Sequence, residues 1–143
     1  MPGRRDEAKM RGMDGPRLTL VPGEYAVWKL DPAAAFPADP GGELFSVTRT
    51  RDELSVVASA SAAPAAGPVE RGWAALRVAG PLDFSLVGIL AGLTAALADA
   101  GVSVFALSTH DTDWLLVKHT DLERAAAALR SGGHEVDLSH TRT

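Results

Sequence analysis

The chain has 143 residues, 46% of them hydrophobic and 22% charged, and its formal net charge at pH 7 is −4. This balance is typical of a soluble globular protein, and the length suits one compact domain or two very small ones that share a core. A negative net charge excludes the basic surface stripe on which nucleic-acid binding depends. The chain has no cysteine, which excludes disulfides, thiol catalysis and thiolate metal sites. No apolar run approaches the ~18 residues of a membrane span and no secretory signal is recognisable, so we expect a cytoplasmic protein that does not bind membranes.

The first half of the chain is predicted to be rich in strands and poor in helix. Residues 1–16 combine glycine, proline and charges without periodicity, so we expect a disordered leader and order from Arg17 onward. The alanine- and proline-rich segments 31–42 and 59–68 are predicted to be loops, with at most a short helix in the first. Strands are predicted over 18–21, 25–30, 45–50 and 54–58, the last two forming a hairpin around Arg51-Asp52.

The second half predicts the order strand, helix, strand, strand, helix, strand. Apolar residues recur at helical spacing from Leu86 to Ala100, behind a possible N-cap at Asp83 or Ser85. A capping-box pattern, Thr120-Asp121-Leu122-Glu123, opens the second helix. The glycines expected to end the two helices are Gly101 and the pair Gly132-Gly133. The strands are predicted over 73–78, 102–108, 114–117 and 134–138.

Two split β-α-β units of this kind form an α+β, ferredoxin-like (βαββαβ) sandwich, in which both helices cover one face of an antiparallel sheet. Such a sheet leaves its other face or its edges uncovered. We therefore expect the strand-rich first half to extend or pair with this sheet rather than to fold alone.

A polar stretch between two predicted apolar strands, Ser108 to Lys118, is the main candidate for a functional site. Asp111 and Asp113 lie two residues apart, so in an extended chain both carboxylates point to the same side of the sheet. There they would attract an ammonium or guanidinium group through charge-assisted hydrogen bonds. The alternative is a solvated turn in which Asp111 and Thr112 bond to nearby backbone. Ser108 and Thr109 either contact the ligand or cap the strand ends.

The start of the first predicted helix is the second candidate. Unpaired backbone N–H groups from Ser85 to Gly88 are suited to receive a carboxylate, which the helix N-terminus favours. The alternative for Gly88 is close packing of the helix on the sheet. Ile89 is expected to supply an apolar wall. An amino acid would then place its carboxylate at the helix start and its cationic group toward Asp113.

Metal and catalytic sites find no support in the sequence, and we expect no cofactor. Asp111-Thr112-Asp113 resembles the opening of a calcium loop, but its sixth and twelfth positions would be Leu116 and Leu122 instead of glycine and glutamate. The four histidines show no metal-ligand spacing. The chain also has no nucleophile elbow and no phosphate-binding loop with a lysine.

Several of these segments resemble the bacterial stand-alone ACT-domain proteins, a group akin to the ACT modules of the CASTOR-type arginine sensors. In the second half the resemblance is carried by Trp73–Val78, Gly80–Leu90, Ser108-Thr109, Asp111–Asp113 and Leu115–Val117. In the first half it is carried by Gly23–Val27 and Thr48–Val57.

The resemblance, which runs from about Arg17 to Val136, implies tandem ACT-like modules with shared or swapped strands. We assign the strand-rich module to 17–68 and the second module to 69–143. In such modules the ligand lies at a module interface, near the glycine-containing start of the first helix. In the arginine sensors an acidic residue matching Asp113 receives the guanidinium. A second acidic residue, at the position of Leu86, is absent here, which leaves the identity of the ligand open.

The sequence therefore favours a non-catalytic regulatory protein that binds an amino acid or similar small ligand and forms a homodimer. A protein-interaction module without a ligand is the alternative, and a small enzyme is favoured less. The predicted ligand-binding residues are Asp113, Asp111, Ser108, Thr109, Ser85, Leu86, Gly88 and Ile89.

Overall fold

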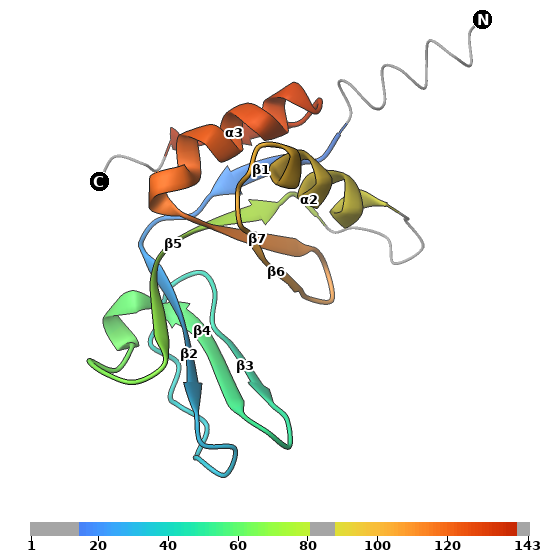
Figure 1. The fold of residues 1–143 in the computed structure, drawn as a ribbon. Coiled ribbons are helices and arrows are strands. Elements are labelled where there is room, and N and C mark those ends of the chain that lie inside the picture. The colour runs from blue at the N-terminus through green and yellow to red at the C-terminus, as the bar shows by residue number, and fades with distance from the viewer. Residues whose placement is uncertain (1–14, 81–87, 140–143) are drawn as a thin grey trace, which may run out of the picture. The chain divides into compact units, whose positions relative to one another are not determined.

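The computed structural model describes residues 15–80 and 88–139. The described chain divides into two compact units, one of which (unit 1) holds the residues up to Val21 and from Ala75 onward. The other (unit 2) holds Pro22–Ala74. The strand β5 (Val69–Val78) contributes its first residues to unit 2 and its last four to unit 1 (Figure 1).

Unit 1 is built on a sheet of five strands in the order β6-β7-β5-β1-β8. β1 is antiparallel to β5, with Leu18 opposite Val78, and parallel to β8, with Leu18 opposite Val136. A strand from the first half of the chain thus lies between the last strand and β5, which confirms that the two halves share a sheet. The strands other than β5 are β1 (Arg17–Leu20), β6 (Phe105–Ser108), β7 (Asp113–Lys118) and β8 (Glu135–Asp137).

Two helices, α2 (Ile89–Asp99) and α3 (Leu122–Ser131), lie together on one side of β5 and β7 (Figure 1). Each helix buries the side chains that recur at helical spacing, as an amphipathic helix on a sheet must. The buried residues are Leu93 and Leu97 in α2, and Leu122, Ala125, Ala126 and Leu129 in α3. With the five strands they form the predicted α+β, ferredoxin-like arrangement.

The first helix begins later than its apolar spacing predicts. Gly88 is the N-cap residue of α2, with a φ of 85° and no side-chain capping bond, so the expected cap at Asp83 or Ser85 is wrong. Asp83 and Ser85, like most of the predicted leader 1–16, lie outside the described residues. Glycine adopts a positive φ at little cost. The spacing of the apolar residues does not predict that the helix starts at such a residue.

The capping box predicted for the second helix is also absent. A short 3-10 turn, η2 (His119–Asp121), precedes α3, and the N-cap is Asp121 rather than Thr120. Asp121 makes no side-chain capping bond, and its Oδ1 accepts a hydrogen bond from Nη2 of Arg124 at 2.7 Å. An ion pair one turn into the helix has replaced the local capping bond.

Both helices end at the predicted glycines in the same hydrogen-bonded arrangement. In α3, the N–H of Gly133 donates to the carbonyl of Arg130 at 3.0 Å, and the N–H of His134 donates to that of Leu129 at 3.1 Å. These two bonds define a Schellman motif, which needs a left-handed residue after the cap. Gly133 supplies it with a φ of 97°, and Gly101, at 74°, does the same for α2.

Unit 2 contains strands and no α-helix in its described residues, which include all of 22–74. Its strand order is β3-β4-β2-β5 and every pairing is antiparallel. The buried side chains of Ala26, Trp28, Val56 and Ala58 form its core. The three further strands are β2 (Tyr25–Leu30), β3 (Ser46–Arg49) and β4 (Leu54–Ser59), and a 3-10 turn, η1 (Ala60–Ala62), follows β4.

Two arginines hold the long loops of unit 2. Arg49 donates to the carbonyls of Pro32 and Ala34, the latter at 2.7 Å, and its guanidinium lies 5.0 Å from the ring centroid of Phe36. Arg71 donates to two carbonyls of the segment predicted as the second loop. Guanidinium groups with several donors can order a segment that has no regular backbone bonding of its own.

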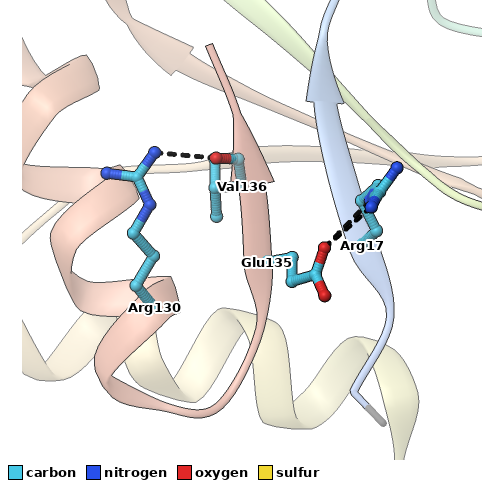
Figure 2. Close-up of polar contacts among 4 residues, drawn as sticks. All are labelled: Arg17, Arg130, Glu135 and Val136. Atoms are coloured by element: carbon cyan, nitrogen blue, oxygen red, sulfur yellow. Dashed lines mark hydrogen bonds and ion pairs between the residues drawn. The ribbon is translucent and has the colours of Figure 1, made fainter. Parts of the chain in front are cut away.

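The strand β8 is held on both sides, as Figure 2 shows. Toward β1, Arg17 Nη2 lies 2.9 Å from Glu135 Oε1. This pair is exposed and contributes only about 0–1 kcal/mol, so it orients the strands more than it stabilises them. On the side away from β1, Arg130 Nη2 donates to the carbonyl of Val136 at 2.7 Å (Figure 2).

Gly132 and Gly133 provide a matched test of the helix end. Gly133→Ala should destabilise the protein by about 1–2 kcal/mol because an L side chain is strained in the left-handed region. Gly132→Ala should be neutral or stabilise by up to about 1 kcal/mol, since Gly132 has a φ of −83° and a Cβ there meets only ordinary contacts of 3.5 Å and longer. Urea unfolding of the two variants measures the difference; equal stabilities would contradict the Schellman assignment.

Candidate functional site

The candidate site is the turn Thr109–Thr112, which joins β6 to β7 and is closed by the facing pair Ser108 and Asp113. The N–H and the Oγ1 of Thr109 both donate to the carbonyl of Thr112, at 2.8 and 3.1 Å. The N–H of Thr112 donates back to Thr109 Oγ1 at 3.4 Å. Thr109 is therefore bonded within the turn, as its strand-capping alternative predicted.

Asp113 is the first residue of β7 and is half-buried. Its Oδ1 accepts a hydrogen bond from Ser108 Oγ at 2.6 Å, which fixes the orientation of the carboxylate. A carboxylate has about four acceptor positions, so one such bond leaves capacity for an ammonium or guanidinium group. Within residues 15–80 and 88–139, Asp113 forms no ion pair.

Asp111 is placed differently. It lies at the exposed tip of the turn, where its Oδ1 is 2.8 Å from Nδ1 of the neighbouring His110. The chain bends at these two residues rather than running extended, so the condition under which Asp111 and Asp113 point to the same side is not met. The geometry of Asp111 is that of a solvated turn, and Asp113 is the carboxylate with a fixed orientation.

Thr112 was expected only in the solvated-turn alternative, as an exposed side chain that bonds to nearby backbone. Only 9% of it is exposed, and its Oγ1 donates to the carbonyl of Val78 at 2.5 Å. Val78 is the last residue of β5, so this bond anchors the turn to the end of that strand. The sequence holds no signal for it, because Thr109 is the same residue type in the same turn and is exposed.

The second candidate region, the start of α2, is described in part. Gly88 is exposed, and a Cβ built on it meets no atom of residues 15–80 and 88–139 within 4 Å. Its alternative interpretation, close packing on the sheet, is therefore wrong, and the positive φ is what requires glycine. Ile89 is the first helical residue and is half-buried. Ser85 and Leu86 lie outside the described residues.

An open groove of about 330 Å³ lies elsewhere on unit 1, along the seam between α2 and α3. Small residues allow the two helices to approach closely: a Cβ built on Gly132 would lie 3.7 Å from that of Ala96. None of the predicted ligand-binding residues lines this groove. Its lining residues are Ala96, Asp99, Ala100, Ala128, Ser131 and Gly132.

Comparison with known proteins places this fold in a family. A family model for the ACT domain matches residues 69–131, and a model for an N-terminal domain matches residues 23–66. The crystal structure of Atu0741 from Agobacterium tumefaciens is 36% identical to the chain, with a TM-score of 0.82, and the match covers 90% of this chain and 96% of Atu0741. The chain belongs to the ACT-domain family. The resemblance seen in the sequence is thus confirmed.

More distant structures share the fold of this ACT-domain protein. VC0802 from Vibrio cholerae, described as a protein of unknown function and possible transport protein, is 19% identical with a TM-score of 0.62, over 83% of this chain and 91% of VC0802. The regulatory subunit of aspartate kinase from Thermus thermophilus is 10% identical with a TM-score of 0.54, over 80% of this chain and 96% of the subunit. No curated protein matches the chain.

Two further observations bear on the type of site. No helix in the described ranges is long and apolar enough to cross a membrane. The same residues contain no group of three or more His, Asp or Glu side chains arranged to hold a metal ion.

Thr112 tests how the turn is anchored. Thr112→Val should lower the free energy of unfolding by about 1–3 kcal/mol, because the carbonyl of Val78 loses its buried donor. Thr112→Ser keeps the hydroxyl and should lose about 1 kcal/mol for the buried methyl group. Urea unfolding of both variants checks this; a valine variant as stable as the native protein would show that the bond is not formed in solution.

Proposed function

We propose that this ACT-domain protein is a non-catalytic cytoplasmic regulator that binds an amino acid at the β6–β7 turn. The observation that carries the proposal is the Asp113 carboxylate, held by Ser108 in one orientation and without a cation among the described residues. A carboxylate fixed in this way is prepared to accept a cationic group through charge-assisted bonds. Ser108 and Thr109 add hydroxyl oxygens beside it.

The other end of the ligand is proposed to lie at the start of α2. The N-cap residue, Gly88, has no side chain with which to cap the helix, so N–H groups of the first turn are suited to receive a carboxylate, with support from the helix dipole. Gly88 and Ile89 belong to this part of the proposed site, together with Ser85 and Leu86 of the preceding segment. The Thr112–Val78 bond supports the pairing of the two regions, because β5 is the strand that leads into α2.

The regulatory part of the proposal draws on the relatives. The Thermus thermophilus protein that shares this fold is a regulatory subunit of aspartate kinase, and we extend a regulatory role to this chain. Binding would act by favouring one packing of the protein over another, because a ligand shifts an equilibrium only by its difference in affinity for the two states.

The second candidate function is a protein-interaction module without a small ligand. The groove along the α2–α3 seam favours it, because the groove is open and lined by small side chains that a partner could contact. No observation favours the small-enzyme alternative. A ligand screen separates the two remaining functions.

The ligand screen compares the native protein with variants of Asp113 and Asp111. One or two of the twenty standard amino acids should raise the melting temperature of the native protein. Asp113→Asn should weaken binding of the same amino acids by about 10- to 100-fold, because a hydrogen bond to a charged group contributes about 1.5–3 kcal/mol. Asp111→Asn removes a carboxylate from the same turn and should leave binding unchanged. Thermal shift followed by calorimetry measures both, and a native protein that responds to no amino acid would favour the interaction module.

We further propose that the protein forms a homodimer through the edge strand β6, which pairs with β7 alone among the described strands. Hydrogen-bonded and non-hydrogen-bonded residue pairs alternate along an antiparallel pair of strands. Because Thr109 and Thr112 form a hydrogen-bonded pair, the N–H groups of Ala106 and Ser108 point away from β7. An unpaired strand edge invites an identical strand from a second copy, in a symmetric contact.

Ala106 tests this dimer. The native protein should have the mass of a dimer by light scattering. Ala106→Pro should yield a monomer with an unchanged circular dichroism spectrum, since proline removes only a donor that faces away from β7. Ala106→Thr keeps the N–H group and should remain dimeric. A monomeric native protein, or a dimeric proline variant, would contradict the β6 interface.

A further inference from the structure

Thr112 stands out as a buried polar residue beside the proposed site that the proposed function does not itself use. Its three polar groups are all bonded: the N–H and the carbonyl to Thr109, and the hydroxyl to the carbonyl of Val78. The first two bonds lie within the turn. The third leaves the turn and reaches another strand, which a residue needed only to close the turn would not require.

We propose that Thr112 is the positioning residue of the proposed ligand site. Its hydroxyl holds the turn, and with it the carboxylate of the next residue, Asp113, at a fixed place relative to the end of β5. The inference rests on the proposed function, because positioning is defined here by the ligand that Asp113 would bind.

The burial of Thr112 supports this role. A side chain that is 9% exposed, directly before an apolar strand, occupies a position that valine would fill with the same shape. A hydroxyl there must be satisfied, and an imperfect bond would be costly. Because threonine is branched at Cβ, its χ1 is restricted, so the bond to Val78 also restrains the backbone that leads into Asp113.

The strand end to which Thr112 bonds is itself held from the other side. The residue after Val78, Ala79, donates its N–H to the carbonyl of Arg17 at 2.7 Å. Arg17 in turn contacts Glu135 of β8 (Figure 2). Val78 is therefore a fixed reference point within unit 1, and a side chain bonded to it shares that fixed position. Without the hydroxyl, the turn is held by its own bonds and by the pairing of β7 with β6 and β5, and the turn itself has no bond to the end of β5.

Thr112 directly precedes Asp113 in the chain, so a restraint on Thr112 acts on the backbone of Asp113 without an intervening residue. Ser108 orients the carboxylate of Asp113 within the hairpin, whereas Thr112 fixes the turn end of the hairpin against the end of β5, beyond the pairing of β7 with β5. The two ends of a ligand are a fixed distance apart. A ligand that contacts both Asp113 and the start of α2 therefore requires a fixed position of the turn as well as a fixed orientation of the carboxylate.

The experiment compares ligand affinity in three variants of the full chain, with each of the twenty standard amino acids as probes. Thr112→Val should raise the dissociation constant of the bound amino acid by about tenfold, which is the effect expected from one mispositioned hydrogen bond. Thr112→Ser, which keeps the hydroxyl, should stay within about twofold of the native value. Val102→Ala removes buried side-chain atoms at the end of α2, away from the turn, and serves as a control for lost stability.

The outcomes are decisive in either direction. Weaker binding in Thr112→Val, rescued in Thr112→Ser and absent in Val102→Ala, supports positioning. Native affinity in Thr112→Val, or an equal loss in Val102→Ala, overturns it, since a purely structural residue would behave in that way.

Amide hydrogen exchange on the ligand-free protein separates this inference from the proposed function. Faster exchange at Leu107 and Trp114, the facing pair next to Ser108 and Asp113, in the valine variant than in the serine variant supports positioning of the hairpin. Equal exchange overturns it. If the native protein binds no amino acid, the proposed function fails, and the exchange result still decides whether Thr112 fixes the hairpin.

Discussion

The pairing of β1 with both β5 and β8 is the constraint on which unit 1 depends. β8 has only three residues and reaches the sheet through β1, with Leu18 opposite Val78 on one side and Val136 on the other. Leu18 is fully buried, so the strand that joins its neighbours also contributes to the buried core. Among the described strands β8 pairs with β1 alone, so a strand from the first half of the chain joins the last strand to β5.

The candidate site depends on the same strands. The end of β5 is bonded to β1 through Ala79 and Arg17, and to the β6–β7 turn through Val78 and Thr112. The turn leads into Asp113, so the carboxylate of Asp113 is connected to β1 through Val78, the last residue of β5, and Ala79, the residue that follows it. Under the proposed function, this arrangement is the physical route by which a ligand at the turn acts on the packing of the unit.

Local patterns predicted much of this fold. The strand from Tyr25 to Leu30 has its predicted bounds, and both helices end at the predicted glycines, because alternation and left-handed caps are properties of a few neighbouring residues. β5 begins at Val69, four residues before its predicted start, because those polar residues are extended only through their pairing with β2. Such pairing leaves no mark in the sequence.

The candidate site shows the same limit. Its acids and hydroxyls were recognisable as a group from composition alone. The difference between Asp111 at the tip and Asp113 in the strand depends on where the turn bends. The difference between exposed Thr109 and buried Thr112 depends on Val78, 34 residues away. Contacts of that sequence separation are created by the fold, so residue type and spacing do not distinguish these pairs.

The bond from Arg130 to the carbonyl of Val136 makes the two edges of the unit 1 sheet unequal. At β8 a side chain occupies an acceptor that an added strand would need, whereas β6 has a partner on one side only among the described strands. A sheet with two available edges can grow without end, which is the geometry of aggregation. With one edge occupied, a strand added at β6 completes the sheet of unit 1, so its growth stops after a single addition.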